Sequence, residues 1–241
     1  MADENRYKIA ISKNLVRLYP ISYTYHRMNK NADNVEKRIL KKLDEMPKEV
    51  SDLFHAKKYD KCASFCEKIL AEDPQSILAH LYIGTIFESR NDYEKAIVHY
   101  SRIVEDFPEF YLASAAKGLA QFEVHDYKGA RNSFLKYLEY HDCDGKVWGI
   151  TAQLENILSG RRNAMQILDE AERRTTVNKD LIYRARGAIL LPTDPDSALL
   201  SFIQAQEAAT EETQKEKYGK DIYNLVLKHI DPLKRTGMNQ R

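Results

Sequence analysis

Three stretches of the sequence repeat one pattern: YDKCASFCEKILAEDP at residues 59–74, YEKAIVHYSRIVEDFP at residues 93–108 and YKGARNSFLKYLEYHD at residues 127–142. Each stretch begins with Tyr, and successive tyrosines are 34 residues apart. The residues that follow keep the same interval: Cys62, Ala96 and Ala130, then Cys66, Tyr100 and Phe134. A fixed period of this length is typical of a solenoid, in which each helix pair buries its apolar face by stacking on its neighbours. The sequence therefore predicts a stack of helix pairs.

Each repeat is predicted to contain a helix A, a turn and a helix B. In the second repeat, helix A is predicted over residues 76–90 with Ser76 as N-cap, because Ser favours that position. Asn91-Asp92 is predicted to break this helix and to cap the next one. Helix B is predicted over residues 93–107, before Pro108.

Small residues are predicted to set the distance between the two helices of a repeat. Ala96 is placed where helix B crosses helix A, because a methyl group lets the two backbones approach closely. Gly84 is placed in the complementary position on helix A. A glycine inside a helix costs about 1 kcal/mol relative to Ala. Its recurrence at Gly118 therefore indicates a packing requirement.

The flanking segments continue the pattern with less regularity. A fourth repeat is predicted to end its helix A at Gly160, and a fifth to begin its helix B at Asp194-Pro195, as N-cap and first turn. A final helix over residues 213–229 would cover the last apolar face. Asp33 with Glu36 forms a capping box that predicts a packing helix before the first repeat.

These residues resemble the tetratricopeptide repeat (TPR) family, whose 34-residue consensus has small residues, aromatic residues and Pro at the corresponding positions. The resemblance covers about residues 43–210 and implies an all-α fold. The expected fold is a right-handed superhelical solenoid of about five TPR helix–turn–helix repeats with a C-terminal capping helix. We expect a basic, Tyr-rich arm at residues 1–31, the solenoid with flanking helices at residues 32–230 and a polar tail at residues 231–241. Lys117 and Arg186 depart from the consensus.

The resemblance also implies a binding groove, because helix A lines the concave side of TPR solenoids. An apolar groove suits an amphipathic helix or an extended apolar segment of a protein partner. The alternative is that these side chains pack only within the solenoid. The predicted groove residues are Leu78, Tyr82, Thr85, Leu112, Ala116, Leu119, Phe122, Gln153 and Tyr183.

Binding of chaperone tails is not expected. TPR proteins that hold such tails use Lys, Asn and Arg side chains for the C-terminal carboxylate. The matching positions of this chain carry none of these side chains; they are Pro47, Ser51, Tyr82, Leu112 and Ala116.

The N-terminal arm is the second candidate site. Residues 5–31 contain six Lys or Arg and no Asp or Glu, interleaved with tyrosines. Such a stretch suits an acidic surface, of a protein or of RNA, because the charges steer association and the rings bury area. The alternatives are that the arm folds into its own groove or has no role. The arm residues singled out are Arg6, Lys8, Lys13, Arg17, Tyr19, Tyr23, Tyr25, Arg27 and Lys30.

Several classes of protein are not indicated by the sequence. It contains no glycine-rich phosphate loop, nucleophile elbow or zinc-hydrolase helix motif, so we expect no enzyme, no cofactor and no metal site. Cys62 and Cys66 are interpreted as packing residues in a reducing, cytoplasmic compartment. A mitochondrial presequence is the alternative for the first residues, and Asp3 and Glu4 argue against it. No apolar run approaches the length of a membrane span.

The pattern therefore predicts a non-enzymatic adaptor or scaffold subunit. It would bind a helical or extended partner segment in the apolar groove, within a larger complex, with the basic arm as second anchor. The alternative is a structural component of a large ribosome-associated, ciliary or microtubule-bound assembly, held mainly by the arm.

Overall fold

The structure is a computed structural model that describes residues 47–142 and 145–225. The described residues form eleven helices in sequence and no β-strand, which confirms the all-α prediction. The chain divides into two compact units, and the boundary falls between Tyr140 and His141. The arm, the packing helix predicted after Asp33 and the polar tail lie outside the described residues.

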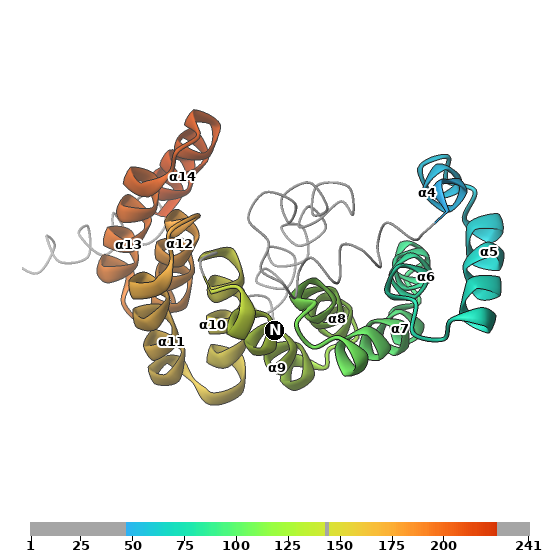
Figure 1. Cartoon of the computed structure of the whole chain (residues 1–241). Coiled ribbons are helices and arrows are strands. Elements are labelled where there is room, and N and C mark those ends of the chain that lie inside the picture. Colours follow the sequence, from blue (N-terminus) through green and yellow to red (C-terminus); the bar gives the residue numbers. More distant parts are fainter. Residues whose placement is uncertain (1–46, 143–144, 226–241) are drawn as a thin grey trace, which may run out of the picture. The chain divides into compact units, whose positions relative to one another are not determined.

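The first unit contains three helix pairs. Helices A (α4, α6 and α8) lie along one side of the unit and helices B (α5, α7 and α9) along the other (Figure 1). Within this stack α7 packs against both α6 and α8, so each pair is held by the next. The helices are α4 (Lys48–His55), α5 (Tyr59–Glu72), α6 (Ile77–Ser89), α7 (Tyr93–Asp106), α8 (Tyr111–Glu123) and α9 (Tyr127–Tyr140).

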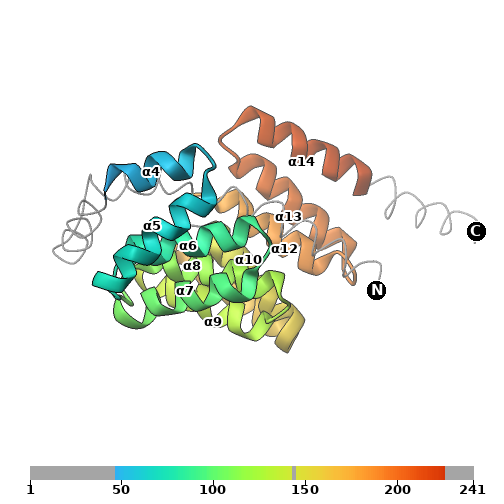
Figure 2. The ribbon, with the colours of Figure 1, turned by 90° about the vertical axis from the view of Figure 1, so that its right-hand side faces the viewer.

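The second unit contains two further pairs and the predicted capping helix. Its helices are α10 (Gly145–Ser159), α11 (Arg161–Arg174), α12 (Lys179–Leu190), α13 (Pro195–Ala208) and α14 (Glu212–Leu225). The capping helix α14 packs against α13 (Figure 2). A buried hydrogen bond also ties it to α12, because the Tyr218 hydroxyl donates to Asp180 Oδ2 over 2.7 Å. Gly160, with φ of 90°, separates α10 from α11 as predicted.

The two helices of a repeat meet where a glycine faces an aromatic ring. A Cβ added to Gly84 would lie 2.6 Å from Cε1 of Tyr100, and one added to Gly118 would lie 3.0 Å from Cε1 of Phe134. The recurrent glycines of helix A are therefore required by the rings of helix B. The predicted packing requirement at Gly84 is therefore set by the ring of Tyr100, and Ala96 is fully buried on the same helix B.

Other repeats fill the corresponding space with other pairs of side chains. In the fifth repeat, Gly187 faces the ring of Phe202 at 2.9 Å from an added Cβ. In the fourth repeat, the positions 34 residues after Gly118 and Phe134 hold Ala152 and Leu168, which are both fully buried. A smaller residue on one helix thus accompanies a larger one on the other, as close packing of the interior requires.

The turns inside the repeats also recur at the 34-residue interval. Lys57, Asn91 and His125 each adopt a left-handed conformation, with φ of 56°, 59° and 64°. In the second repeat the backbone N–H of Asp92 donates to Phe87 O and that of Asn91 to Glu88 O, both over 2.9 Å. These two bonds form a Schellman motif, which satisfies carbonyl groups at the end of helix A.

Aspartate caps begin the following helices. The Asp92 side chain accepts a hydrogen bond from the backbone of Lys95, and Asp194 accepts one from Ser197, so both predicted caps are confirmed. Ser76 is the N-cap residue of α6 as predicted, but its side chain makes no capping hydrogen bond.

The glycine–ring contact makes a prediction about stability. Gly84→Ala should lower the thermal unfolding midpoint, because overpacking costs about 1–3 kcal/mol, which outweighs the gain in helix propensity of about 1 kcal/mol. Gly219→Ala in α14 is the control, because its methyl would meet only the end of the Gln206 side chain, at 3.1 Å. Circular dichroism should show the first variant less stable and the second equally or more stable than the wild type. Equal midpoints for both variants would contradict the packing argument.

The left-handed turns make a second prediction. Lys57→Gly should stabilise the protein by up to about 1 kcal/mol, because glycine adopts a positive φ without a steric penalty. Lys61→Gly is the matched control: it is an exposed lysine inside α5, where glycine should destabilise by about 1 kcal/mol. Chemical denaturation of both variants measures whether each substitution raises or lowers the free energy of unfolding. Destabilisation by Lys57→Gly would show that the left-handed conformation is not retained.

Candidate protein-binding surface

One face of α6 and α8 carries half-buried side chains at helical spacing. On α6 these are Leu81, Thr85 and Glu88, and on α8 they are Ala116, Leu119 and Glu123. Residues spaced three or four apart lie on one side of a helix. We call these six residues the A face of the first unit. It combines apolar side chains with two carboxylates.

The structure separates the nine predicted groove residues into two groups. Leu78, Tyr82, Leu112 and Phe122 are only 4–9% exposed. Aromatic packing accounts for two of them, since the ring of Tyr82 lies 5.1 Å from that of Phe54 and the ring of Phe122 lies 5.5 Å from that of Tyr127. These four side chains therefore belong to the buried core beneath the surface.

The other five predicted groove residues are half-buried. Thr85, Ala116 and Leu119 belong to the A face of the first unit, whereas Gln153 in α10 and Tyr183 in α12 belong to the second unit. The sequence prediction did not include Leu81, Glu88 or Glu123. The signal that could have found them is their spacing of three or four residues from the predicted residues Thr85 and Leu119.

The two carboxylates of the A face lie in a partly desolvated setting. The Tyr100 hydroxyl donates to Glu88 Oε2 over 2.8 Å. Burial raises the pKa of Glu88, and the negative charge of Glu123 raises it further. Burial also raises the pKa of Glu123. Among the residues that the structure describes, no Lys or Arg lies within ion-pair distance of either carboxylate. Each would therefore gain from an added cation.

A histidine pair joins the two helices of the second repeat. Nδ1 of His80 lies 2.9 Å from Nδ1 of His99. The Nε2–H of His80 donates to Pro74 O over 3.0 Å, which leaves its Nδ1 to accept the proton of His99. The ring of Phe87 stacks on His99 at 5.7 Å. Burial lowers the pKa of His99 to about 4, and the neighbouring His80 contributes to this shift.

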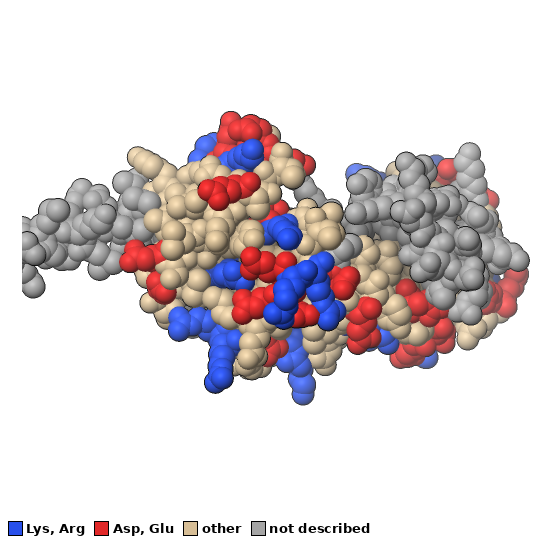
Figure 3. Space-filling model, turned by 60° about the vertical axis from the view of Figure 1, so that its left-hand side comes forward, with Lys and Arg blue, Asp and Glu red and all other residues tan. Residues whose placement is uncertain are grey.

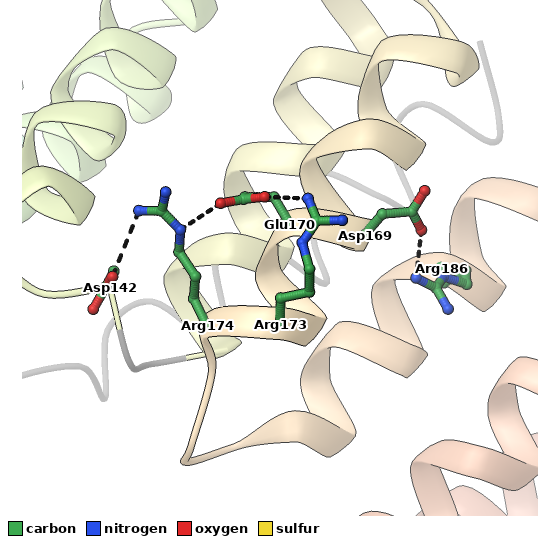
Figure 4. A network of polar contacts seen from close by, with 6 residues as sticks. All are labelled: Asp142, Asp169, Glu170, Arg173, Arg174 and Arg186. Carbon is green, nitrogen blue, oxygen red and sulfur yellow. Dashed lines mark hydrogen bonds and ion pairs between the residues drawn. The ribbon is translucent and has the colours of Figure 1, made fainter.

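The charged side chains of the second unit largely pair with one another. On the face in Figure 3, basic and acidic side chains lie next to one another. Figure 4 shows the central network, in which Arg174 reaches Glu170 of its own helix and Asp142 at 3.6 Å. Arg186 of α12 lies 3.0 Å from Asp169 and from Glu172 of α11. Arg186 departs from the family consensus and here joins two helices.

The described residues offer little to catalysis or to metal binding. Cys62 and Cys66 are fully buried, and burial raises the pKa of Cys66 to about 12, so its thiol stays protonated at neutral pH. No cluster of three metal-ligating His, Cys, Asp or Glu side chains occurs in the part of the chain that the structure describes. Within residues 47–142 and 145–225, no helix has the length and apolar character needed to cross a membrane.

Comparisons with known proteins agree with this architecture. The family model described as tetratricopeptide repeat matches residues 78–109, which span α6 and α7. The solved structure of MamA superposes with a TM-score of 0.59 at 15% sequence identity, covering 71% of this chain and 96% of MamA. The fold of this chain is therefore that of tetratricopeptide repeat proteins, and residues 78–109 match the model of that repeat.

Two further solved structures show the same TPR fold. YrrB, described as a TPR protein with an unusual peptide-binding site, has a TM-score of 0.57 at 12% identity, covering 79% of this chain and all of YrrB. Yeast Tom70 has a TM-score of 0.58 at 16% identity, covering 91% of this chain and 49% of Tom70. A search of curated proteins found no match. At these identities, the likeness establishes the fold alone.

The histidine pair predicts a pH dependence of stability. The pKa of His99 in the folded protein lies below its ordinary value of 6.5. The unfolded chain therefore takes up this proton first, and stability falls as the pH drops from 6.5 towards 4. Thermal unfolding between pH 7 and pH 5 should show a smaller loss of stability for His99→Gln than for the wild type. His55→Gln, at an exposed histidine of α4, is the control and should behave as the wild type. Equal pH profiles for His99→Gln and the wild type would contradict this assignment.

Proposed function

We propose that this TPR protein is a non-enzymatic adaptor or scaffold subunit that binds a helical or extended protein segment on the A face of its first unit. The observation that carries this proposal is the A face itself, where half-buried Leu81, Ala116 and Leu119 lie among polar side chains. A segment with apolar side chains at helical spacing can contact both α6 and α8. The peptide-binding site named for YrrB, which shares the fold, supports this kind of function.

The proposal also includes the further contacts, the second anchor and the location that were predicted from the sequence. Gln153 and Tyr183 in the second unit are proposed further contacts with a partner. The basic arm at residues 1–31 is a proposed second anchor on an acidic protein or RNA surface. We place the protein in the cytoplasm, within a larger complex.

The arm supports a second candidate function, as a structural component of a large assembly. The observation that favours it is the charge of residues 5–31, with six Lys or Arg and no Asp or Glu. Salt distinguishes the two candidates. Binding of the arm to a polyanion should weaken steeply between about 50 and 200 mM salt, because association releases counterions. Apolar contacts on the A face should change little over this range.

Leu119→Glu tests the adaptor function. The substitution places a charge in the middle of the A face, where contact with an apolar segment would desolvate it. Capture of partners from native lysate, quantified by mass spectrometry, should fall at least about tenfold, which corresponds to about 1.4 kcal/mol.

The matched control is Leu135→Glu, at a leucine of α9 in the same unit that is 38% exposed. Circular dichroism should show both variants folded, and the control should capture partners as the wild type does. Unchanged capture by Leu119→Glu would overturn the adaptor proposal.

A further inference from the structure

The A face combines apolar side chains with two carboxylates that no described cation neutralises. Glu88 follows Leu81 by seven residues on α6, and Glu123 follows Leu119 by four on α8. Burial opposes ionisation of both groups, and the charge of Glu123 adds to this effect at Glu88. The Tyr100 hydrogen bond at Glu88 and His125 near Glu123 act in the opposite direction. An occupant with positive charges would relieve the effects of burial and of the Glu123 charge, and aromatic rings would cover the neighbouring leucines. The chemistry of the face therefore selects a basic, aromatic segment.

The same chain contains a segment of this chemistry. Residues 5–31 hold six Lys or Arg, no Asp or Glu, and four tyrosines, namely Tyr7, Tyr19, Tyr23 and Tyr25. Residues 32–46 connect this segment to Pro47, which directly precedes α4 of the first unit. As the packing helix predicted after Asp33, these 15 residues would span about 20 Å, and fully extended they would span up to about 50 Å. This connection joins the first unit, which also carries the A face. The distance that residues 32–46 must span therefore does not depend on the position of the second unit.

We propose that residues 5–31 of this chain occupy the A face of its first unit, with lysines or arginines against Glu88 and Glu123. The inference rests on the proposed function, because it makes the arm a competitor of the external partner segment for one surface. A tethered segment has an effective concentration in the millimolar range. A partner must therefore displace the arm, and an acidic surface that draws the arm away opens the A face.

Carbodiimide cross-linking of the full-length chain tests this contact. The reagent joins a carboxylate to an amine only when the two are in direct contact. We expect cross-links between Glu88 or Glu123 and Lys8, Lys13 or Lys30, identified by mass spectrometry. A mixture of unlabelled and ¹⁵N-labelled chains should give these links without mixed isotopes, because the contact lies within one chain. The links should fall several-fold in about 0.5 M salt, since screening weakens contacts between charges.

The matched variants are Glu88→Gln with Glu123→Gln, and Glu105→Gln with Glu139→Gln at exposed carboxylates of α7 and α9. The first double variant should lose the links to the arm, and the second should keep them. Absent links, or links of mixed isotope only, would overturn the inference. Loss of partner capture by Leu119→Glu without any link to the arm would leave the proposed function standing and refute this inference alone.

Discussion

The close approach of helix A to helix B depends on one contact, the aromatic ring of helix B against the glycine of helix A. At Gly84 the space for a Cβ is already taken by Tyr100, and at Gly118 by Phe134. Because ring and backbone are in contact, the two helices of a repeat have little freedom to shift. The fully buried Tyr100 also directs its hydroxyl to Glu88, so the same contact helps to place a carboxylate of the A face.

The turn between helix A and helix B recurs in each repeat of the first unit and gives these repeats the same geometry. The left-handed residue at the end of each helix A in the first unit, followed by an Asp cap in the second repeat, reverses the chain in few residues. Since turn and helix lengths keep the 34-residue interval, α6 and α8 lie along the same side of the unit (Figure 1). Within the A face only Thr85 and Leu119 are 34 residues apart, so the regular turns place the two helices but do not determine the composition of this face.

Periodicity could predict the helix pairs, the glycines and two of the caps, because those features depend on contacts within a repeat. The composition of the surface was less predictable. Tyr82 has the spacing of a groove residue, yet the ring of Phe54 from the preceding repeat packs against it. The burial of a helix A residue depends on neighbours in adjacent repeats, whose side chains differ. The His80–His99 pair was not predicted either, since the two residues do not recur at the 34-residue interval.

The proposed occupation of the A face by residues 5–31 of the same chain can be tested directly. Methyl NMR of the full-length chain, with a soluble paramagnetic probe, measures the access of solvent to Leu81 and Leu119 directly. We predict that their methyl signals broaden little at low salt and more strongly at high salt, when the cationic arm is released. The methyls of Val98, exposed on α7, should broaden at both salt concentrations. Equal broadening of Leu81 and Leu119 at low and high salt would contradict this occupation by the arm.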